Sequence, residues 1–266
     1  MSAVSGDRRP GPARRGADVA DTDLALTLTV LGCAGSYAGP GNACSGYLVR
    51  SEGATTVVDL GPGTLANLQL HVAIADVDAV VFTHHHPDHW LDLPILRNAM
   101  RYYLGVEGLP VYGTADALEQ ARVVIGDLEP TLRWTVIDPS ARVTVGDQRL
   151  SFSLTDHPVE TLATRVEAGG RTLVYSADTG SGWRPGDQVS GVDLLLCEAT
   201  IPAAFEDRAP HLSARQAGAL AREWGVGRLV VTHVAPGVDP EDQREAAAAA
   251  FGGPVDLASV NATFAV

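Results

Sequence analysis

Histidine and aspartate residues are spaced along this 266-residue chain in a way that suits metal binding. Four of them fall within one short run, and three more follow at separate points downstream. The seven are His84, His86, Asp88, His89, His157, Asp178 and His233. Imidazole and carboxylate groups are ligands that zinc and other first-row divalent metals accept. His84 and His86 are two residues apart and face one way. Asp88 and His89 come after a proline-bent turn and can face a second metal.

Each of these ligand groups comes after an apolar run that predicts a β-strand. The strands are Ala79–Thr83 before the first group, Ser151–Thr155 before His157, Leu173–Ser176 before Asp178, and Leu229–Thr232 before His233. One histidine at a strand end is most often a hydrogen-bonded structural residue. Because six of the eight histidines lie at such ends, we expect a shared metal site at one edge of the sheets. We expect His85 to point away from the metal, and His71, on a predicted helix, to be structural or solvated.

Strands and helices alternate from Leu24 onward, which predicts one α/β domain over residues 23–266. The other predicted strands are Leu24–Leu31, Ser45–Arg50, Thr55–Leu60, Leu162–Glu167 and Asp193–Cys197. Two strands are predicted within Arg142–Asp156, and the strands before Asp178 and His233 extend over Thr172–Ser176 and Arg228–Thr232. The predicted helices are Thr64–Val72, capped by Thr64, then Leu91–Leu104, Thr114–Ile125, Ser213–Trp224 and Glu241–Phe251. Two mixed sheets with helices outside form a four-layer αββα sandwich. Residues 1–22, rich in Gly, Pro, Ala and Arg, predict a disordered leader.

The order of the metal-type residues resembles that of the metallo-β-lactamase-fold hydrolases. The glycine loop Leu31–Ser36 and the segment Asp59–Gly63 also match that family. The resemblance implies the αββα sandwich and a dinuclear site, usually of zinc, with Mn²⁺ or Fe²⁺ as other candidates. It implies a first metal held by His84, His86 and His157, a second held by Asp88, His89 and His233, and Asp178 as the bridge. A hydroxide bridging the two metals would attack the substrate, and Asp59 would orient the first histidine loop through hydrogen bonds.

Two further stretches resemble the paired loops of the ribonuclease Z branch. They are Leu195–Thr200 and His211–Gly218. The resemblance implies that His211 assists the phosphodiester transition state and that Glu198 supports it, so the catalytic set is Asp88, His211 and Glu198. Cys197 stands where that branch usually has a histidine. The structural alternative for His211 is a neighbour of a helix N-terminus capped by Ser213.

Charge and loop lengths indicate a small substrate. All 19 basic residues are Arg, which excludes P-loop, pyridoxal-phosphate and Ser-Lys chemistries, because each needs a Lys. The net charge is −13, and the loop Ala34–Cys44 has no basic residue to hold a polyanion. Residues 158–177, between His157 and Asp178, leave room for a hairpin alone, whereas tRNA-processing relatives insert a long arm there. We therefore expect a phosphodiesterase similar to the cyclic-nucleotide phosphodiesterases of this fold, and nucleic acid is an unlikely partner.

Two other hydrolytic functions stay open at this point: RNA 3′ processing of the ribonuclease Z type, and arylsulfatase, thioesterase or lactonase activity on the same metals. Ser45, Trp90, Tyr102 and Tyr103 are candidates for substrate contact, although a tryptophan such as Trp90 more often packs under helices. The three cysteines show no C-x-x-C spacing, and the N-terminus has no apolar signal region. These features predict a cytoplasmic protein with reduced cysteines and no membrane association. A homodimer is the assembly that the resemblance implies.

Overall fold

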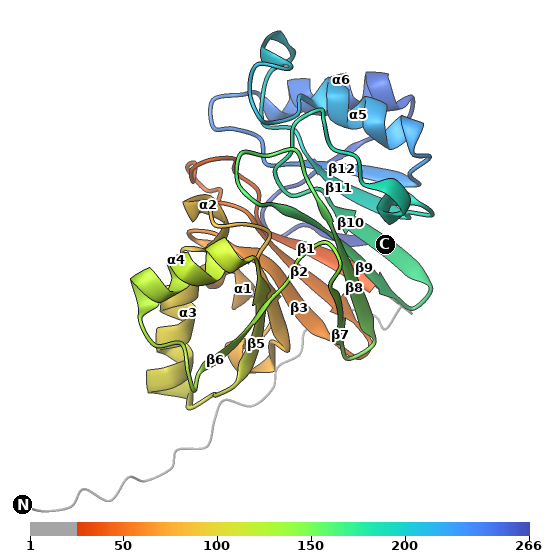
Figure 1. The fold of residues 1–266 in the computed structure, drawn as a ribbon. Coiled ribbons are helices and arrows are strands. Elements are labelled where there is room, and N and C mark those ends of the chain that lie inside the picture. Colours follow the sequence, from red (N-terminus) through yellow and green to blue (C-terminus); the bar gives the residue numbers. More distant parts are fainter. Residues whose placement is uncertain (1–25) are drawn as a thin grey trace, which may run out of the picture.

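The computed structural model describes residues 26–266, which form two seven-stranded sheets (Figure 1). The first sheet has the order β14 (Thr263–Ala265), β1 (Leu26–Gly32), β2 (Gly46–Ser51), β3 (Thr55–Leu60), β4 (Ala79–Val81), β5 (Leu109–Gly113) and β6 (Leu132–Val136). The second has the order β13 (Asp256–Leu257), β12 (Arg228–Thr232), β11 (Leu194–Glu198), β10 (Arg171–Tyr175), β9 (Leu162–Ala168), β8 (Gln148–Leu154) and β7 (Arg142–Val145). The predicted pair of mixed sheets is thus confirmed.

Helices cover the outer faces of both sheets and complete four layers (Figure 1). The α-helices are α1 (Thr64–Leu68), α2 (Pro87–Trp90), α3 (Leu93–Ala99), α4 (Ala115–Ile125), α5 (Ala214–Glu223) and α6 (Pro240–Phe251). Short helical turns are η1 (Ile74–Asp76), the π-helix η2 (Met100–Leu104), η3 (Gly186–Val189) and η4 (Ala203–Phe205). Apolar side chains of α1, α3 and α4 pack on the first sheet, and those of α5 and α6 pack on the second. The αββα sandwich is therefore confirmed.

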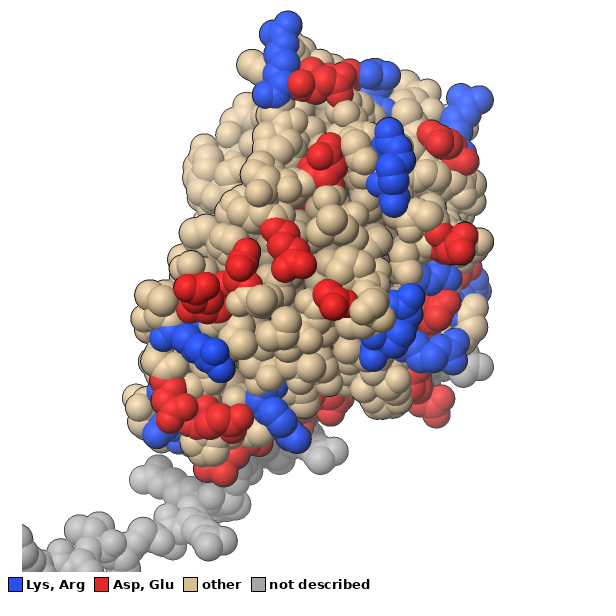
Figure 2. Space-filling model, in the orientation of Figure 1, with Lys and Arg blue, Asp and Glu red and all other residues tan. Residues whose placement is uncertain are grey.

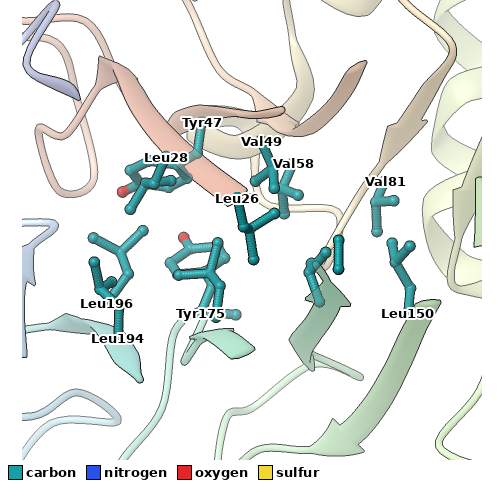
Figure 3. Close-up of a cluster of buried hydrophobic side chains, with 14 of the residues drawn as sticks. Leu26, Leu28, Tyr47, Val49, Val58, Val81, Leu150, Tyr175, Leu194 and Leu196 are labelled. Atoms are coloured by element: carbon teal, nitrogen blue, oxygen red, sulfur yellow. The ribbon is translucent and has the colours of Figure 1, made fainter. Parts of the chain in front are cut away.

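The central core lies between the two sheets, as Figure 3 shows. Alternation along β11 explains how one strand serves two layers. Leu194 and Leu196 belong to the central cluster, while Leu195 and Cys197 pack against the helices outside. Since successive side chains of a strand point to opposite faces, a continuous apolar run is what a strand buried on both sides requires.

The strands before the predicted site run in matching directions. β10, β11 and β12 are parallel neighbours, and β8 is antiparallel to β9, which is antiparallel to β10. β8, β10, β11 and β12 therefore all end at one edge of the second sheet. In the first sheet, β3 and β4 are parallel and also end together. This topology brings residues that are far apart in the sequence to one place.

Several sequence-based boundaries were wrong. The predicted helix Leu91–Leu104 is divided into α3 and the π-helix η2, while Trp90 and Leu91 close the short α2 before it. The predicted helix Thr64–Val72 ends at Leu68, and its cap residue is Gly63 rather than Thr64, because the Thr64 hydroxyl bonds back to the Gly61 carbonyl. Four strands, β5, β6, β13 and β14, were not predicted. β5 carries a proline, and β13 and β14 are only two and three residues long, so these three give no clear alternating pattern. β6 does alternate apolar and polar residues and was missed despite this pattern.

The predicted leader, residues 1–22, lies outside the described residues, and the domain boundary at residue 23 stays a prediction. Among the residues that the structure describes, none of the helices is both long enough and apolar enough to span a membrane.

The three cysteines are buried and form no disulfide. Burial raises the pKa of Cys33 and of Cys44 to about 11, and raises the pKa of Cys197 further. We expect native protein to react slowly with a thiol reagent at neutral pH, because thiolates are scarce and shielded. Titration with such a reagent should find three reactive thiols only after denaturation. One thiol reacting at once in the native protein would contradict this prediction.

Candidate metal centre

The structure brings all seven predicted metal-type residues to one edge of the sandwich, where they form two clusters. The first holds His84, His86, His157 and Asp178, and the second holds Asp88, His89 and His233. Within each cluster, one ligand-type atom from every residue lies within 4.8 Å of the others. The grouping matches the one that the family resemblance implies, although the role of each residue as a ligand stays a prediction.

Asp178 lies between the clusters. Its Oδ2 is 3.8 Å from His84 Nε2, and its Oδ1 is 3.3 Å from His89 Nε2 and 3.4 Å from His233 Nε2. In the second cluster, Asp88 Oδ2 is 3.3 Å from His233 Nε2. A carboxylate with its two oxygens turned toward different clusters is the arrangement that a bridge between two cations needs.

Several atoms that face the centre have no hydrogen-bond partner, although they are buried. These atoms are His84 Nε2, His89 Nε2 and Asp178 Oδ1. An unpaired polar atom in the protein interior costs about 1–3 kcal/mol. Lone pairs that converge without donors between them are stabilised by a cation, so the residues fit a divalent metal centre.

The electrostatics of the first cluster agree with this fit. Burial lowers the pKa of His84 well below its usual value and also lowers the pKa of His86 and His157, so these rings are neutral at pH 7. A neutral imidazole has the free lone pair that metal ligation requires. Burial would raise the pKa of Asp178, but His233 and His89 outweigh it and hold this pKa well below the usual range. In the second cluster, burial would lower the pKa of His89, but the charges and hydrogen bonds of Asp178 and Asp59 raise it well above its usual value, so a metal there would have to displace a proton.

Local structure fixes the first histidine loop. Pro87 occupies the first turn of α2, where its missing N–H costs nothing. Asp59, at the end of β3, accepts hydrogen bonds from Thr83 N at 2.9 Å and from His89 Nδ1 at 2.7 Å. Gly61 leaves room for α2, since a Cβ there would lie 1.9 Å from the Asp88 carbonyl oxygen. The hydrogen bonds expected of Asp59 are therefore present.

His211 and Glu198 lie beside the two clusters, and His211 forms a third group with Asp178 and His233, whose ligand-type atoms also lie within 4.8 Å of one another. The His211 ring is centred 5.3 Å from that of His157 and 5.8 Å from that of His233. Its Nδ1 is 3.0 Å from Glu198 Oε1, and Glu198 is fully buried. Burial would lower the pKa of His211, but the hydrogen bond and charge of Glu198 raise it to about 9. Ser213 caps α5 with a full capping box, so the helix needs no help from His211.

The remaining candidates lie elsewhere. His85 is in none of the clusters, and His71 contacts Asn261 at 2.8 Å. Ser45 is fully buried, and Trp90 is 5% exposed and donates its indole N–H to the His85 carbonyl. Tyr102 and Tyr103 are exposed on η2, and the Tyr102 hydroxyl accepts a hydrogen bond from Arg97. Trp90 is therefore packed among buried residues, which is the arrangement that a tryptophan adopts more often than substrate contact.

Two threonines that the sequence did not single out join the site. Thr83 and Thr200 each lie between a buried carboxylate and a histidine of the clusters. Their positions beside the candidate ligands could not have identified them from the sequence, because threonine is common in strands whether or not a site is near.

Comparisons with known proteins identify relatives over most of the chain. A family model described as "Beta-lactamase superfamily domain" matches residues 55–234. The protein Rv1339 of Mycobacterium tuberculosis is 34% identical, over 92% of this chain and 94% of its own. The "Probable metallo-hydrolase YhfI" of Bacillus subtilis is 31% identical, over 88% of this chain and 97% of its own. Its crystal structure, titled a metallo-beta-lactamase fold protein, covers 90% of this chain and 98% of that chain with a TM-score of 0.83. A "Ribonuclease Z" of Methanopyrus kandleri is 31% identical, over 86% of this chain and 94% of its own.

Proposed function

Because this chain belongs to the β-lactamase superfamily and is a metallo-hydrolase of that family, we propose that it hydrolyses a small phosphodiester. The observation that carries the proposal is the His211–Glu198 pair beside the two clusters of candidate metal ligands. A phosphodiester needs a group that stabilises charge or protonates the leaving oxygen, and histidine can do either. The similarity to a ribonuclease, an enzyme that cleaves phosphodiester bonds, supports this class of substrate.

The roles of the chain's residues follow from their positions. Two divalent cations, with zinc as the first candidate and Mn²⁺ or Fe²⁺ as others, would supply a water of lowered pKa and positive charge for the phosphate. His84, His86 and His157 would hold one cation, Asp88, His89 and His233 the other, and Asp178 both. Asp88 would also orient the attacking water, since its Oδ2 lies among the candidate ligand atoms, 3.3 Å from His233 Nε2 and 3.5 Å from His89 Nε2. His211 would donate a hydrogen bond or a proton to the substrate, with its ring held by Glu198.

Two features favour a small substrate over a structured RNA. Residues 158–177 are taken up by the hairpin of β9 and β10, which leaves no arm between His157 and Asp178. On the face shown in Figure 2, arginines are interspersed with acidic side chains and do not form one basic patch. Because nucleic-acid binding depends on neutralising many phosphates, these features support a mononucleotide-sized diester. The expected partner is therefore that small molecule, with a cytoplasmic location and a homodimeric assembly as further expectations.

The proposal predicts turnover of small phosphodiesters by zinc-loaded protein. Bis-p-nitrophenyl phosphate and 3′,5′-cyclic AMP should both be hydrolysed, and a chelator should stop the reaction. The absence of turnover of both compounds, with two equivalents of zinc bound, would refute the proposal. Pre-tRNA with a 3′ trailer and p-nitrophenyl sulfate serve as comparison substrates. Faster cleavage of the pre-tRNA would favour the ribonuclease Z function, and faster hydrolysis of the sulfate would favour a different bond.

A further inference from the structure

Two hydrogen-bonded groups on opposite sides of the centre share one pattern. In the first, Asp59 Oδ2 accepts a hydrogen bond from Thr83 Oγ1 at 2.9 Å, and Thr83 Oγ1 lies 3.0 Å from His84 Nδ1. The same carboxylate accepts from His89 Nδ1 at 2.7 Å. One buried carboxylate thus serves one histidine directly and a second one through a threonine.

The second group lies on the other sheet. Glu198 Oε2 accepts from Thr200 Oγ1 at 2.5 Å, and Thr200 Oγ1 lies 2.7 Å from His233 Nδ1. The other oxygen of Glu198 lies 3.0 Å from His211 Nδ1. The order of groups is the same: carboxylate, threonine hydroxyl, histidine of the metal clusters, with a second histidine bound to the carboxylate itself.

The proton count in each group fixes which atom donates. Backbone N–H groups already donate to these carboxylates, Thr83 N to Asp59 and three backbone amides to Glu198. A carboxylate surrounded in this way is an acceptor, so the single proton of each threonine hydroxyl points toward it. The threonine oxygen can then only accept from the neighbouring ring. His84 and His233 must therefore carry a proton on Nδ1. Their Nε2 atoms face the carboxylates of the centre, and His233 Nε2 lies 3.3 Å from Asp88 Oδ2. Without metal this Nε2 can hold a second proton for that carboxylate, and a bound cation would take that proton's place.

We propose that Thr83 and Thr200 are positioning residues that hold His84 and His233 as Nδ1–H tautomers and so aim both Nε2 lone pairs at the metal centre. This inference rests on the metal centre but not on the identity of the substrate. We call each chain of carboxylate, threonine hydroxyl and histidine a relay. His89 and His157 need no relay, because Nδ1 of His89 lies directly against the Asp59 carboxylate and Nδ1 of His157 lies directly against the Pro210 carbonyl. The relays serve the two rings whose Nδ1 atoms reach only a hydroxyl.

The two relays differ in what else they touch. Glu198 keeps three backbone donors and His211 when Thr200 is changed, so the His211–Glu198 pair should survive. Loss of Thr200 should therefore weaken metal binding in the cluster of His233 alone. Loss of Thr83 should weaken metal binding in the cluster of His84 alone.

The test uses Thr83→Val and Thr200→Val, which keep the side-chain shape, beside Thr83→Ser and Thr200→Ser, which keep the hydroxyl. Nitrogen-15 spectra of the histidine rings in metal-free protein, at about pH 8 and above the ordinary histidine pKa of about 6.5, report the tautomer. Wild type and both serine variants should have protonated Nδ1 on His84 and His233. Each valine variant should lose this signature at its own histidine, and its affinity for one zinc equivalent, from chelator competition, should fall about 10- to 100-fold.

Thr29→Val is the matched control, since Thr29 is fully buried and its hydroxyl lies 2.8 Å from that of Thr263, a residue of none of the metal clusters. It should change neither the tautomers nor the metal affinity. An unprotonated Nδ1 on His84 or His233 in metal-free wild type, with the proton on Nε2 instead, would overturn the proposal, even where a valine variant fails to fold. Valine variants that keep both tautomers and full zinc affinity would overturn it as well. Because none of these readouts uses a substrate, failure of the phosphodiesterase proposal leaves this test intact.

Discussion

Replacing Asp178 with Ala should remove metal from the protein and reduce hydrolysis to the level of the chelated enzyme. Asp178 is 2% exposed and faces His84, His89 and His233 with its two oxygens. Its loss takes a negative charge from both clusters at once, whereas loss of one histidine affects a single cluster. Bound divalent metals contribute several kcal/mol to such reactions, which corresponds to a decrease in kcat/KM of about 10³-fold or more.

Metal analysis of purified protein dialysed against limiting zinc measures this effect directly. Wild type should retain two equivalents, and Asp178→Ala should retain less than one. His86→Ala should lose one equivalent, because only the first cluster contains that ring. Glu119→Ala, at an exposed position of α4, is the control for removing an acidic side chain and should retain both. Asp178→Ala protein that kept two equivalents of zinc would exclude Asp178 as the bridge.

The ligand residues could be predicted from the sequence because two independent signals coincide in them. Their residue types suit a metal, and each follows an apolar run that predicts a buried strand. The parallel run β10, β11 and β12 then fixes where the strand ends meet, so Asp178 and His233 lie together without any special loop. The pairing of His211 with Glu198 depended on resemblance, since neither residue has a pattern of its own.

Other features depend on tertiary contacts that no local pattern encodes. The break between α3 and η2 lies inside a continuous helical pattern, where packing on the first sheet decides the geometry. β5, which carries a proline, gains its place by pairing with β4 and β6. Thr83 matters because the Asp59 carboxylate of the neighbouring strand reaches its hydroxyl, and Thr200 matters because its hydroxyl lies against His233, which follows another strand. A threonine in a sequence does not indicate either contact.

His211→Ala should keep both metal equivalents while kcat falls about 10²–10⁴-fold, the range typical of a lost general acid or base. The His211 ring lies beside both clusters, but Glu198 holds its Nδ1, and His233 has its own partner in Thr200. Removing the ring therefore leaves the other candidate ligands with their hydrogen bonds. His71→Ala is the matched control, because His71 contacts Asn261 away from the centre, and it should leave kcat unchanged.

The leaving group separates the two roles that His211 could have. If the ring gives a proton to the departing oxygen, the loss should be larger for cyclic AMP, whose leaving group is an alkoxide, than for bis-p-nitrophenyl phosphate, whose leaving group is a stable phenolate. Equal losses on both substrates would mean that the ring stabilises charge on the phosphate instead. The ligand-type atoms of Asp178, His211 and His233 also lie within 4.8 Å of one another, so a third role for His211, as a metal ligand, has a structural basis. Loss of one metal equivalent in His211→Ala would place His211 among the ligands and remove it from the catalytic set.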